Sequence, residues 1–162
     1  MSTRREAREW AVQILFQLDL NPNSETSAEE IFREFWNGQL RLREDDEPAP
    51  IPPEPIRKFT ESLVMGVLEN REAIDKLISS CVKNWNIQRI GGIERNVLRM
   101  GIFELAFAKE KTPQAVVINE SVDISKFFGT RESGRFVNGV LDSIAKNLAR
   151  EAAKPQEWSP GT

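Results

Sequence analysis

Residues 93–108 read IERNVLRMGIFELAFA, and their apolar side chains cover most of the circumference of the helix that this spacing predicts. The apolar residues fall on two sides, with Val97, Met100, Gly101 and Ala108 on one and Leu98, Ile102 and Leu105 on the other. A helix with so much apolar surface belongs at the centre of a helical bundle. This segment therefore predicts an all-α domain that is built around it.

Apolar residues recur at helical spacing along the rest of the chain, and no stretch alternates strictly for long enough to predict a sheet. Six further helices are expected, at about 3–20, 27–37, from 54, after Asn70, at 112–128, and over the segment that carries Val137 to Leu148. The segments on either side of Asn70 could instead form one bent helix. Gly129 is expected to end the helix at 112–128 in a left-handed conformation.

Composition excludes several classes of protein. The chain has 162 residues, which suits one soluble domain, and its net charge of −3 becomes +1 when the acidic run 44–47 is set aside. It contains no histidine and one cysteine, Cys81, which excludes Ser/His/Asp and Cys/His triads, the usual zinc sites and disulfides. No apolar run approaches the roughly 20 residues of a membrane-crossing helix, and the charged start lacks the apolar part of a secretory signal. We therefore expect a cytoplasmic protein with no membrane segment, metal or cofactor.

Two segments differ in composition from the rest. Residues 38–55 are acidic and then rich in proline, ending in EDDEPAPIPPEP, which removes helix donors and offers no apolar face to bury. Residues 154–162 contain two prolines and no periodicity. We expect one helical domain over residues 1–153, with a mobile loop at 38–55 and a flexible tail at 154–162.

Glu104 is the residue that best suits catalysis, because it projects from the apolar side of the central helix. Burial of an ionised carboxylate is unfavourable unless it is paired or its pKa rises, so Glu104 could be a general acid. A carboxylate held by an arginine or by helix-end amides explains the pattern better. Glu120 and Asp123 are expected on the solvent side of their helix, and Gly91-Gly92 lacks the lysine of a phosphate-binding loop. The sequence therefore favours a protein that is not an enzyme.

The first helix carries a row of residues that points away from its apolar stripe. The members of this row, spaced three, four and four residues apart, are Arg5, Arg8, Val12 and Phe16. Guanidinium groups bind phosphates and an aromatic ring can stack on an unpaired base, so the row suits single-stranded RNA. Arginines are also common on solvated faces, and Phe16 could instead pack on a neighbouring helix.

A second basic and aromatic group surrounds the turn before the last helix. Its members are Lys126, Arg131, Arg135 and Phe136, with Glu132 among them. Phe136 falls at the margin of the apolar stripe, and Glu132 would repel phosphates and weaken RNA binding. An ordinary local salt bridge is the alternative. Gly139 lies inside the last helix, where glycine is unfavourable, and close contact with another helix is the expected reason.

Three segments together resemble the NusB family of bacterial transcription antitermination factors. They are RREAREWAVQILFQLD at 4–19, IERNVLRMGIFEL at 93–105, and VVINESVDISKFFG at 116–129 followed by RFVNGVLD at 135–142. The resemblance spans nearly the whole chain and keeps the order and spacing of the segments. It departs from the family in the insertion at 38–55, in the Glu9-Trp10 pair and in the extended tail.

The resemblance implies a seven-helix fold of two small helical bundles packed together. It also implies that the protein binds boxA RNA with the ribosomal protein NusE and assembles with other Nus factors on RNA polymerase during ribosomal RNA synthesis. The RNA-facing residues that it implies are Arg4, Arg5, Arg8, Phe16, Glu132, Arg135 and Phe136, and Glu94 matches a position on the partner side. A helical protein-interaction module without an RNA role, such as a homodimer joined through the outward row of the first helix, is the alternative.

Overall fold

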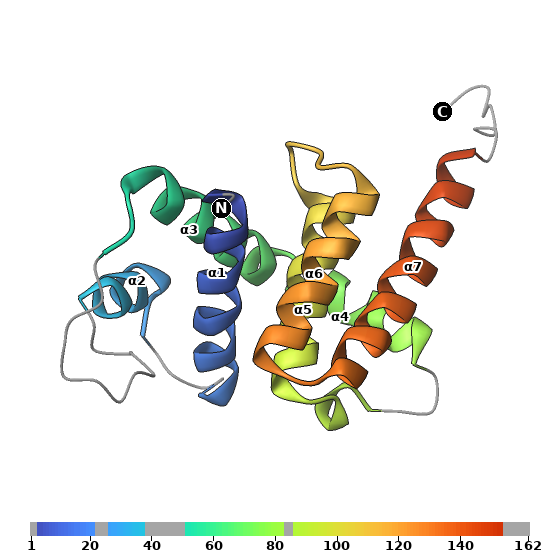
Figure 1. The fold of residues 1–162 in the computed structure, drawn as a ribbon, viewed down its shortest axis with the longest axis horizontal. Helices are drawn as coiled ribbons and strands as arrows, with labels where there is room; N and C mark the ends of the chain where they lie inside the picture. Colours follow the sequence, from blue (N-terminus) through green and yellow to red (C-terminus); the bar gives the residue numbers. More distant parts are fainter. Residues whose placement is uncertain (1–2, 22–25, 38–50, 83–85, 154–162) are drawn as a thin grey trace, which may run out of the picture.

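The computed structural model describes residues 3–21, 26–37, 51–82 and 86–153, and within them every regular element is helical (Figure 1). The α-helices are α1 (Thr3–Leu20), α2 (Ala28–Trp36), α3 (Glu54–Glu69), α4 (Arg71–Cys81), α5 (Gly92–Ile102), α6 (Gln114–Phe128) and α7 (Arg131–Ala153). A 3₁₀ turn, η1 (Ile87–Arg89), precedes α5, and a π-helical turn, η2 (Phe103–Phe107), follows it. The expected all-α architecture is confirmed. The expected tail at 154–162 and most of the expected loop, residues 38–50, lie outside the described residues.

The helices form two groups that meet along α1 and α5. Figure 1 shows α1, α2 and α3 in one half of the molecule and α4 to α7 in the other. Helix α1 packs on α3, α6 packs on α7, and α5 contacts α1, α3, α4, α6 and α7. The expectation that the helix after residue 92 is central is therefore confirmed. Helices α3 and α4 are separate elements that meet at Asn70, so the alternative of one bent helix is wrong.

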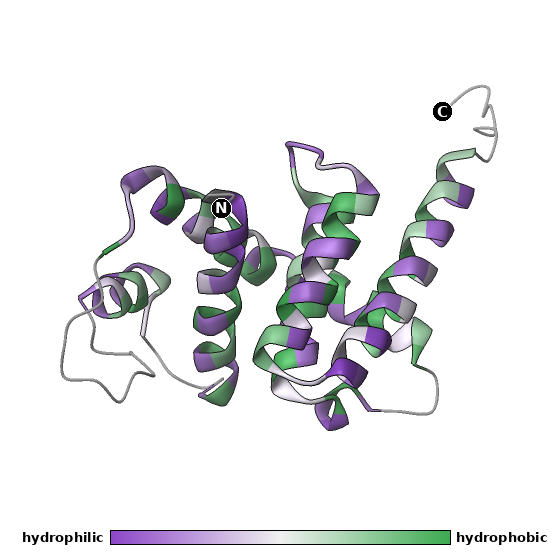
Figure 2. Ribbon diagram, viewed as in Figure 1, coloured by the Kyte–Doolittle hydropathy of each residue, from purple (hydrophilic) through white to green (hydrophobic). Residues whose placement is uncertain are grey.

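One core joins the two groups of helices. Hydrophilic and hydrophobic residues alternate along α1, α6 and α7, as amphipathic helices require (Figure 2). The largest completely buried side chains come from six different helices and include Ile14, Leu63, Ile78, Met100, Ile124 and Leu141. These residues belong to one continuous apolar cluster, so the two groups are held together chiefly by apolar burial.

An ion-pair network ties the end of α1 to α5. Asp19 accepts hydrogen bonds from Arg95 Nε at 2.8 Å and from Asn96 Nδ2 at 3.1 Å, and its Oδ1 lies 3.3 Å from Arg99 Nη1. Burial by itself raises the pKa of Asp19, but the bond from Arg95, the charge of Arg99 and the bond from Asn96 together lower it. The Asp19 carboxylate is thus held in its charged form between two helices.

The central helix changes character at Phe103, which the sequence pattern did not predict. Ala108 N donates to Phe103 O at 2.9 Å, which is the i to i+5 bond of a π-turn. The Phe103 ring lies directly over Gly66 of α3, where a Cβ atom built on that glycine would stand 2.1 Å from the ring. The absence of a side chain at Gly66 thus lets α3 approach the π-turn closely.

Gly139, in contrast, has no neighbour within 4 Å of the position that a Cβ atom would occupy. The expectation that this glycine allows a close helix contact is therefore wrong. Gly139 is exposed and lies on the solvent side of α7.

The two glycines should respond to alanine in opposite directions. We expect Gly66→Ala to lower the free energy of unfolding by about 1–3 kcal/mol, because the added methyl group overpacks the core. We expect Gly139→Ala to raise it by up to about 1 kcal/mol, because alanine favours a helix and meets nothing there. Urea denaturation of both variants measures the change in the free energy of unfolding. A change of the same sign in both would contradict the packing described for α3.

Candidate nucleic-acid interface

Arg8 of α1 lies in the interior of the protein. Its Nε donates to Glu104 Oε2 at 2.9 Å and its Nη2 to Glu104 Oε1 at 2.7 Å, and the two residues are 2% and 3% exposed. The expectation that Glu104 is a buried carboxylate held by an arginine is thus confirmed.

The expectation that Arg8 and Val12 point outwards is wrong, because both residues are buried. Helix α1 packs against α3 on one side and against α5 on another. The middle of the row, Arg8 and Val12, is therefore covered in the same way as the apolar stripe of the helix. Because Arg8 and Val12 are buried, the row does not form the exposed surface that the homodimer considered above would require.

Arg5 points from α1 towards α6. Its Nη2 donates to Asp123 Oδ2 at 3.0 Å, and its Nε donates to Glu120. The bond to Glu120 is the main reason why the pKa of Arg5 is raised, against the opposing effect of burial. Asp123 is exposed, as expected for the solvent side, whereas Glu120 is partly buried between α6 and α1. The charge of Arg5 is therefore balanced by two carboxylates.

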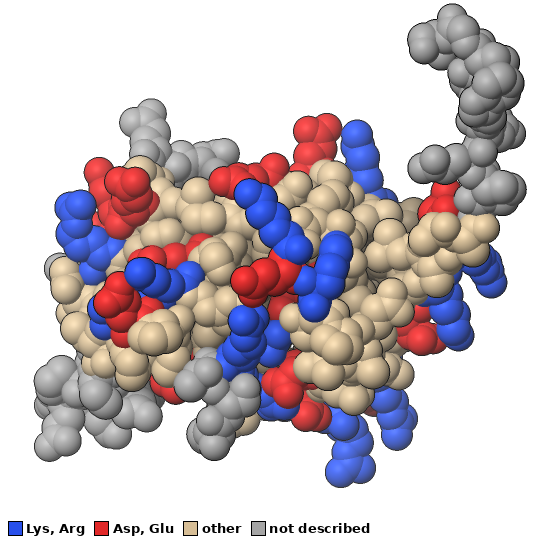
Figure 3. Space-filling model, turned by 90° about the horizontal axis from the view of Figure 1, so that it is seen from above, with Lys and Arg blue, Asp and Glu red and all other residues tan. Residues whose placement is uncertain are grey.

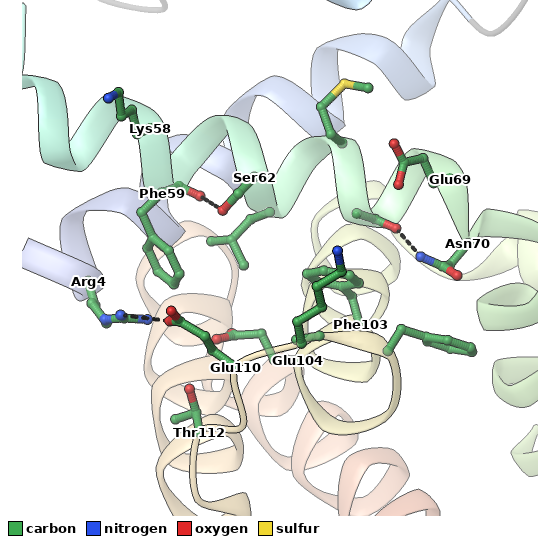
Figure 4. Close-up of a pocket in the computed structure, with 16 residues that line it drawn as sticks. Arg4, Lys58, Phe59, Ser62, Glu69, Asn70, Phe103, Glu104, Glu110 and Thr112 are labelled. Carbon is green, nitrogen blue, oxygen red and sulfur yellow. Dashed lines mark hydrogen bonds and ion pairs between the residues drawn. The ribbon is translucent and has the colours of Figure 1, made fainter.

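Arg4 points towards α3 instead. Its guanidinium carbon lies 4.3 Å from the centroid of the Phe59 ring, and its Nη2 is 3.4 Å from Glu110 Oε2. Figure 4 shows this pair at the edge of a cavity between α3, the π-turn and the segment before α6. Arg8 also approaches this ring, with its guanidinium carbon 5.6 Å from the centroid, so Arg4 and Arg8 lie on the α3 side of α1 and Arg5 lies on the α6 side.

The cavity beside Arg4 has a volume of about 680 Å³ and an aromatic lining from Phe59, Phe103 and Phe107. The charged side chains around it have both signs, with Lys58 and Lys109 balanced by Glu69 and Glu110. Figure 3 shows basic and acidic residues interspersed in the same way on the face seen from above. Such a surface does not attract a polyanion strongly.

The α6–α7 corner, which we define as residues 126–136, is held by a compact set of hydrogen bonds. Ser133 N donates to Thr130 Oγ1 at 3.2 Å and Thr130 N donates to Ser133 Oγ at 3.1 Å, which caps the start of α7. Ser133 Oγ also donates to Glu94 of α5. Gly129 ends α6 as expected, but its φ of −121° is not left-handed. It is required because Ser133 and Ser125 O leave no space for a Cβ atom.

The basic side chains of this corner form no ion pair with a carboxylate of the described residues. Lys126, Arg131 and Arg135 are exposed, and none of them forms an ion pair within the described parts of the chain. Glu132 is exposed as well and lacks such a partner in the same ranges, so the local salt bridge considered above is absent there. Within the described parts of the chain, the corner thus combines three cations that form no ion pair with one carboxylate, whereas the described cations of α1 are all paired.

The two predicted aromatic residues occupy different surroundings. Phe16 is half-buried, and its ring lies over Gly92, where a built Cβ atom would be 2.7 Å from it. Gly92 and Glu94 belong to the first turn of α5, and Glu94 binds Ser133, so the start of α5 joins the lower half of α1 to the corner. Phe136 is half-buried on α7, as its marginal position in the stripe predicted.

Phe127 is the residue that the sequence analysis did not select. It is 72% exposed at the end of α6. At 100° per residue it lies roughly 100° from the centre of the buried stripe of α6 and on the side of Glu120 and Asp123. This angle is the signal that could have identified it.

Breaking the buried pair tests whether Arg8 is structural. We expect Arg8→Met to lower the free energy of unfolding by about 3–5 kcal/mol, because the Glu104 carboxylate loses its partner in the interior. The double variant Arg8→Met, Glu104→Leu should recover most of this loss, since no buried charge remains. Arg4→Met is the matched control and should cost less than about 1 kcal/mol, because its ion pair is exposed. Guanidinium denaturation measures the free energy of unfolding of all three variants. A loss of less than about 1 kcal/mol for Arg8→Met would contradict a structural role of Arg8 in the interior.

No helix in the described ranges is long and apolar enough to cross a bilayer. No group of three or more Cys, Asp or Glu residues in those ranges is arranged to hold a metal ion.

Comparison with known proteins agrees with the fold and with the three segments quoted above. Transcription antitermination protein NusB of Pelotomaculum thermopropionicum is 38% identical over 98% of this chain and 94% of its own length, and that of Sorangium cellulosum is 39% identical over 93% and 96%. A crystal structure of NusB and NusE in complex with double-stranded RNA superposes with a TM-score of 0.73 at 32% identity, over 91% of this chain and 98% of the other. The solution structure of Aquifex aeolicus NusB gives 0.72 at 31% identity, over 98% and 97%. The sequence model of the NusB family matches residues 5–146, and the chain belongs to that family.

Proposed function

We propose that this protein is a transcription antitermination factor that binds RNA together with a NusE-type ribosomal protein. The RNA element is boxA, which the family resemblance implies. The observation that carries the proposal is the α6–α7 corner, where three exposed cations without ion-pair partners in the described ranges stand beside aromatic rings in a chain of the NusB family. The neighbouring structure that holds NusB with NusE and double-stranded RNA supports both partners.

The protein acts by binding, without a chemical step. Among the described residues, the one carboxylate that is deeply buried outside the network around Asp19 is that of Glu104, which is bound by Arg8 and is closed to a substrate. Cations at the corner neutralise phosphates and contribute affinity, and aromatic rings contribute selectivity for bases. Transcription takes place in the cytoplasm of a bacterium, which is where we place this protein.

The predicted RNA-facing residues have unequal parts in this proposal. Direct contact is assigned to Arg4, Arg5, Phe16, Arg131, Arg135 and Phe136, with Glu132 as a carboxylate that weakens binding. Arg8 is assigned to holding α1 in place, because it has no exposed surface. Glu94 is assigned to the partner side, next to the hydroxyl of Ser133 that it binds.

The partner protein has an electrostatic role in this proposal. The chain has a net charge of −3, and the cations of α1 are neutralised by its own carboxylates. A basic ribosomal protein would add the positive surface that this chain lacks, so the pair would bind RNA more tightly than the chain alone.

Fluorescence anisotropy with a labelled single-stranded boxA RNA tests the proposed function. We expect the NusE-type partner to tighten binding at least about fivefold, which corresponds to about 1 kcal/mol of coupling. Glu132→Gln should tighten binding by the chain alone, because a charge that repels phosphates is removed. Equal affinities with and without the partner would refute its electrostatic role. Absence of RNA binding in both states would refute the function.

A further inference from the structure

Phe127 is an exposed aromatic residue that the packing of the protein does not require. It is the most exposed large apolar side chain in the described ranges, at 72%, ahead of Leu20 at 58%, Ile51 at 52% and Val116 at 42%. Its neighbour Phe128 packs against the core, so the end of α6 stays anchored without Phe127. The exposed ring therefore calls for an explanation outside the folded monomer.

The ring of Phe127 is held in a defined orientation. Its centroid lies 5.0 Å from that of Phe128 at an interplanar angle of 80°, which is an edge-to-face pair. The hydrogen bonds of Thr130 and Ser133 fix the turn that follows two residues later. A ring presented on a rigid support loses little conformational entropy on binding, which favours a flat ligand.

The charges around Phe127 are those of a site for an anion. Lys126 is adjacent in sequence, Arg131 begins the next helix, and Arg135 lies one turn further on; all three are exposed and lack ion pairs in the described ranges. Asp123, one turn earlier on the same side of α6, is bound by Arg5. Glu132 is the one carboxylate of the corner itself. Glu120, on the same side of α6, shares Arg5 with Asp123, so this part of the described surface has four cations and three carboxylates, a net charge of +1.

This combination favours a nucleic acid over a protein as the partner of Phe127. Protein interfaces are depleted of charge around their buried aromatic residues, and the expected ribosomal partner is itself basic. Sites for single-stranded nucleic acid combine cations that follow the backbone with aromatic rings that stack on bases. A base inside a duplex is already stacked on both faces, so only an unpaired base can cover an exposed ring.

We propose that Phe127 stacks on one unpaired base of the bound RNA and makes the α6–α7 corner selective for single-stranded over double-stranded RNA. This inference rests on the proposed function. Phe128 acts as the support that orients the ring, and Lys126, Arg131 and Arg135 hold the phosphates on either side of the base.

The test measures the affinity of Phe127 variants for a labelled single-stranded boxA RNA and for the same sequence as a duplex. We expect Phe127→Ala and Phe127→Leu each to weaken single-strand binding about 5- to 20-fold, because stacking needs an aromatic face that leucine lacks. Phe127→Trp should retain the affinity of the natural protein. Binding to the duplex should not depend on residue 127. Val116→Ala, an exposed apolar change on the same helix, is the matched control and should have no effect.

A covalent readout complements the affinities. RNA that carries 5-iodouridine is cross-linked by light to the bound protein, and the modified peptide is identified by mass spectrometry. We expect modification at Phe127 with the single strand and its loss in Phe127→Leu. Circular dichroism melts of every variant should stay within a few degrees of the natural protein, because the ring is exposed.

The outcomes distinguish a failure of the proposed stacking role from a failure of the proposed RNA-binding function. If Phe127→Ala binds RNA normally while Glu132→Gln tightens binding, the stacking role is overturned and the proposed function stands. If leucine is as good as phenylalanine, or if the duplex depends on residue 127 equally, stacking on an unpaired base is overturned. If Phe127→Ala weakens only the binding of the ribosomal protein, the ring belongs to a protein interface instead. If the natural protein binds no RNA with or without its partner, both proposals fail.

Discussion

The buried ion pair between Arg8 and Glu104 is the constraint that organises the rest of the molecule. A charged pair in the interior requires both partners to be fully satisfied, and the two hydrogen bonds of 2.7 and 2.9 Å provide this. The pair fixes the upper half of α1 against the π-turn after α5, while Asp19 ties the lower half to α5 through Arg95 and Asn96. Helix α1 is thereby joined to the central helix at both ends, and the two groups of helices form one body.

The contacts that hold α1 also pair its three described arginines with carboxylates of the same chain. Arg8 is committed to Glu104, Arg5 to Glu120 and Asp123, and Arg4 to Glu110. Three exposed cations without such partners in the described ranges lie together in sequence at the α6–α7 corner, which is positioned by a different bond, from Ser133 to Glu94. The corner is thus tied to the start of α5, whereas the partners of the α1 arginines lie on the π-turn, on α6 and on the segment before α6. This difference is why we propose a binding surface that is centred on the corner.

The sequence was sufficient for the helices, because amphipathic periodicity reports burial directly: the limits of α1 and α6 and the central position of α5 follow from it. It also predicted that Glu104 is a buried carboxylate held by an arginine or by helix-end amides, and Arg8 is the group that holds it. It failed for Arg8 and Val12, because one helix packed on two sides buries two stripes, and periodicity assigns only one of them to the core. It failed for Gly139, because helix propensity cannot distinguish a contact from open solvent. Phe127 was missed, although its place roughly 100° from the centre of the buried stripe of α6 indicates exposure.

The salt dependence of RNA affinity tests most directly whether the corner binds the phosphates. The double variant Arg131→Gln, Arg135→Gln should flatten the slope of log Kd against log salt concentration by about 1.4, since each phosphate contact on a single strand contributes about 0.7. The control Lys146→Gln, Arg150→Gln removes two exposed cations from the same helix, at least roughly 16 Å further along it, and should leave the slope unchanged. An equal slope change in both double variants, or none in the first, would contradict a binding surface centred on the corner.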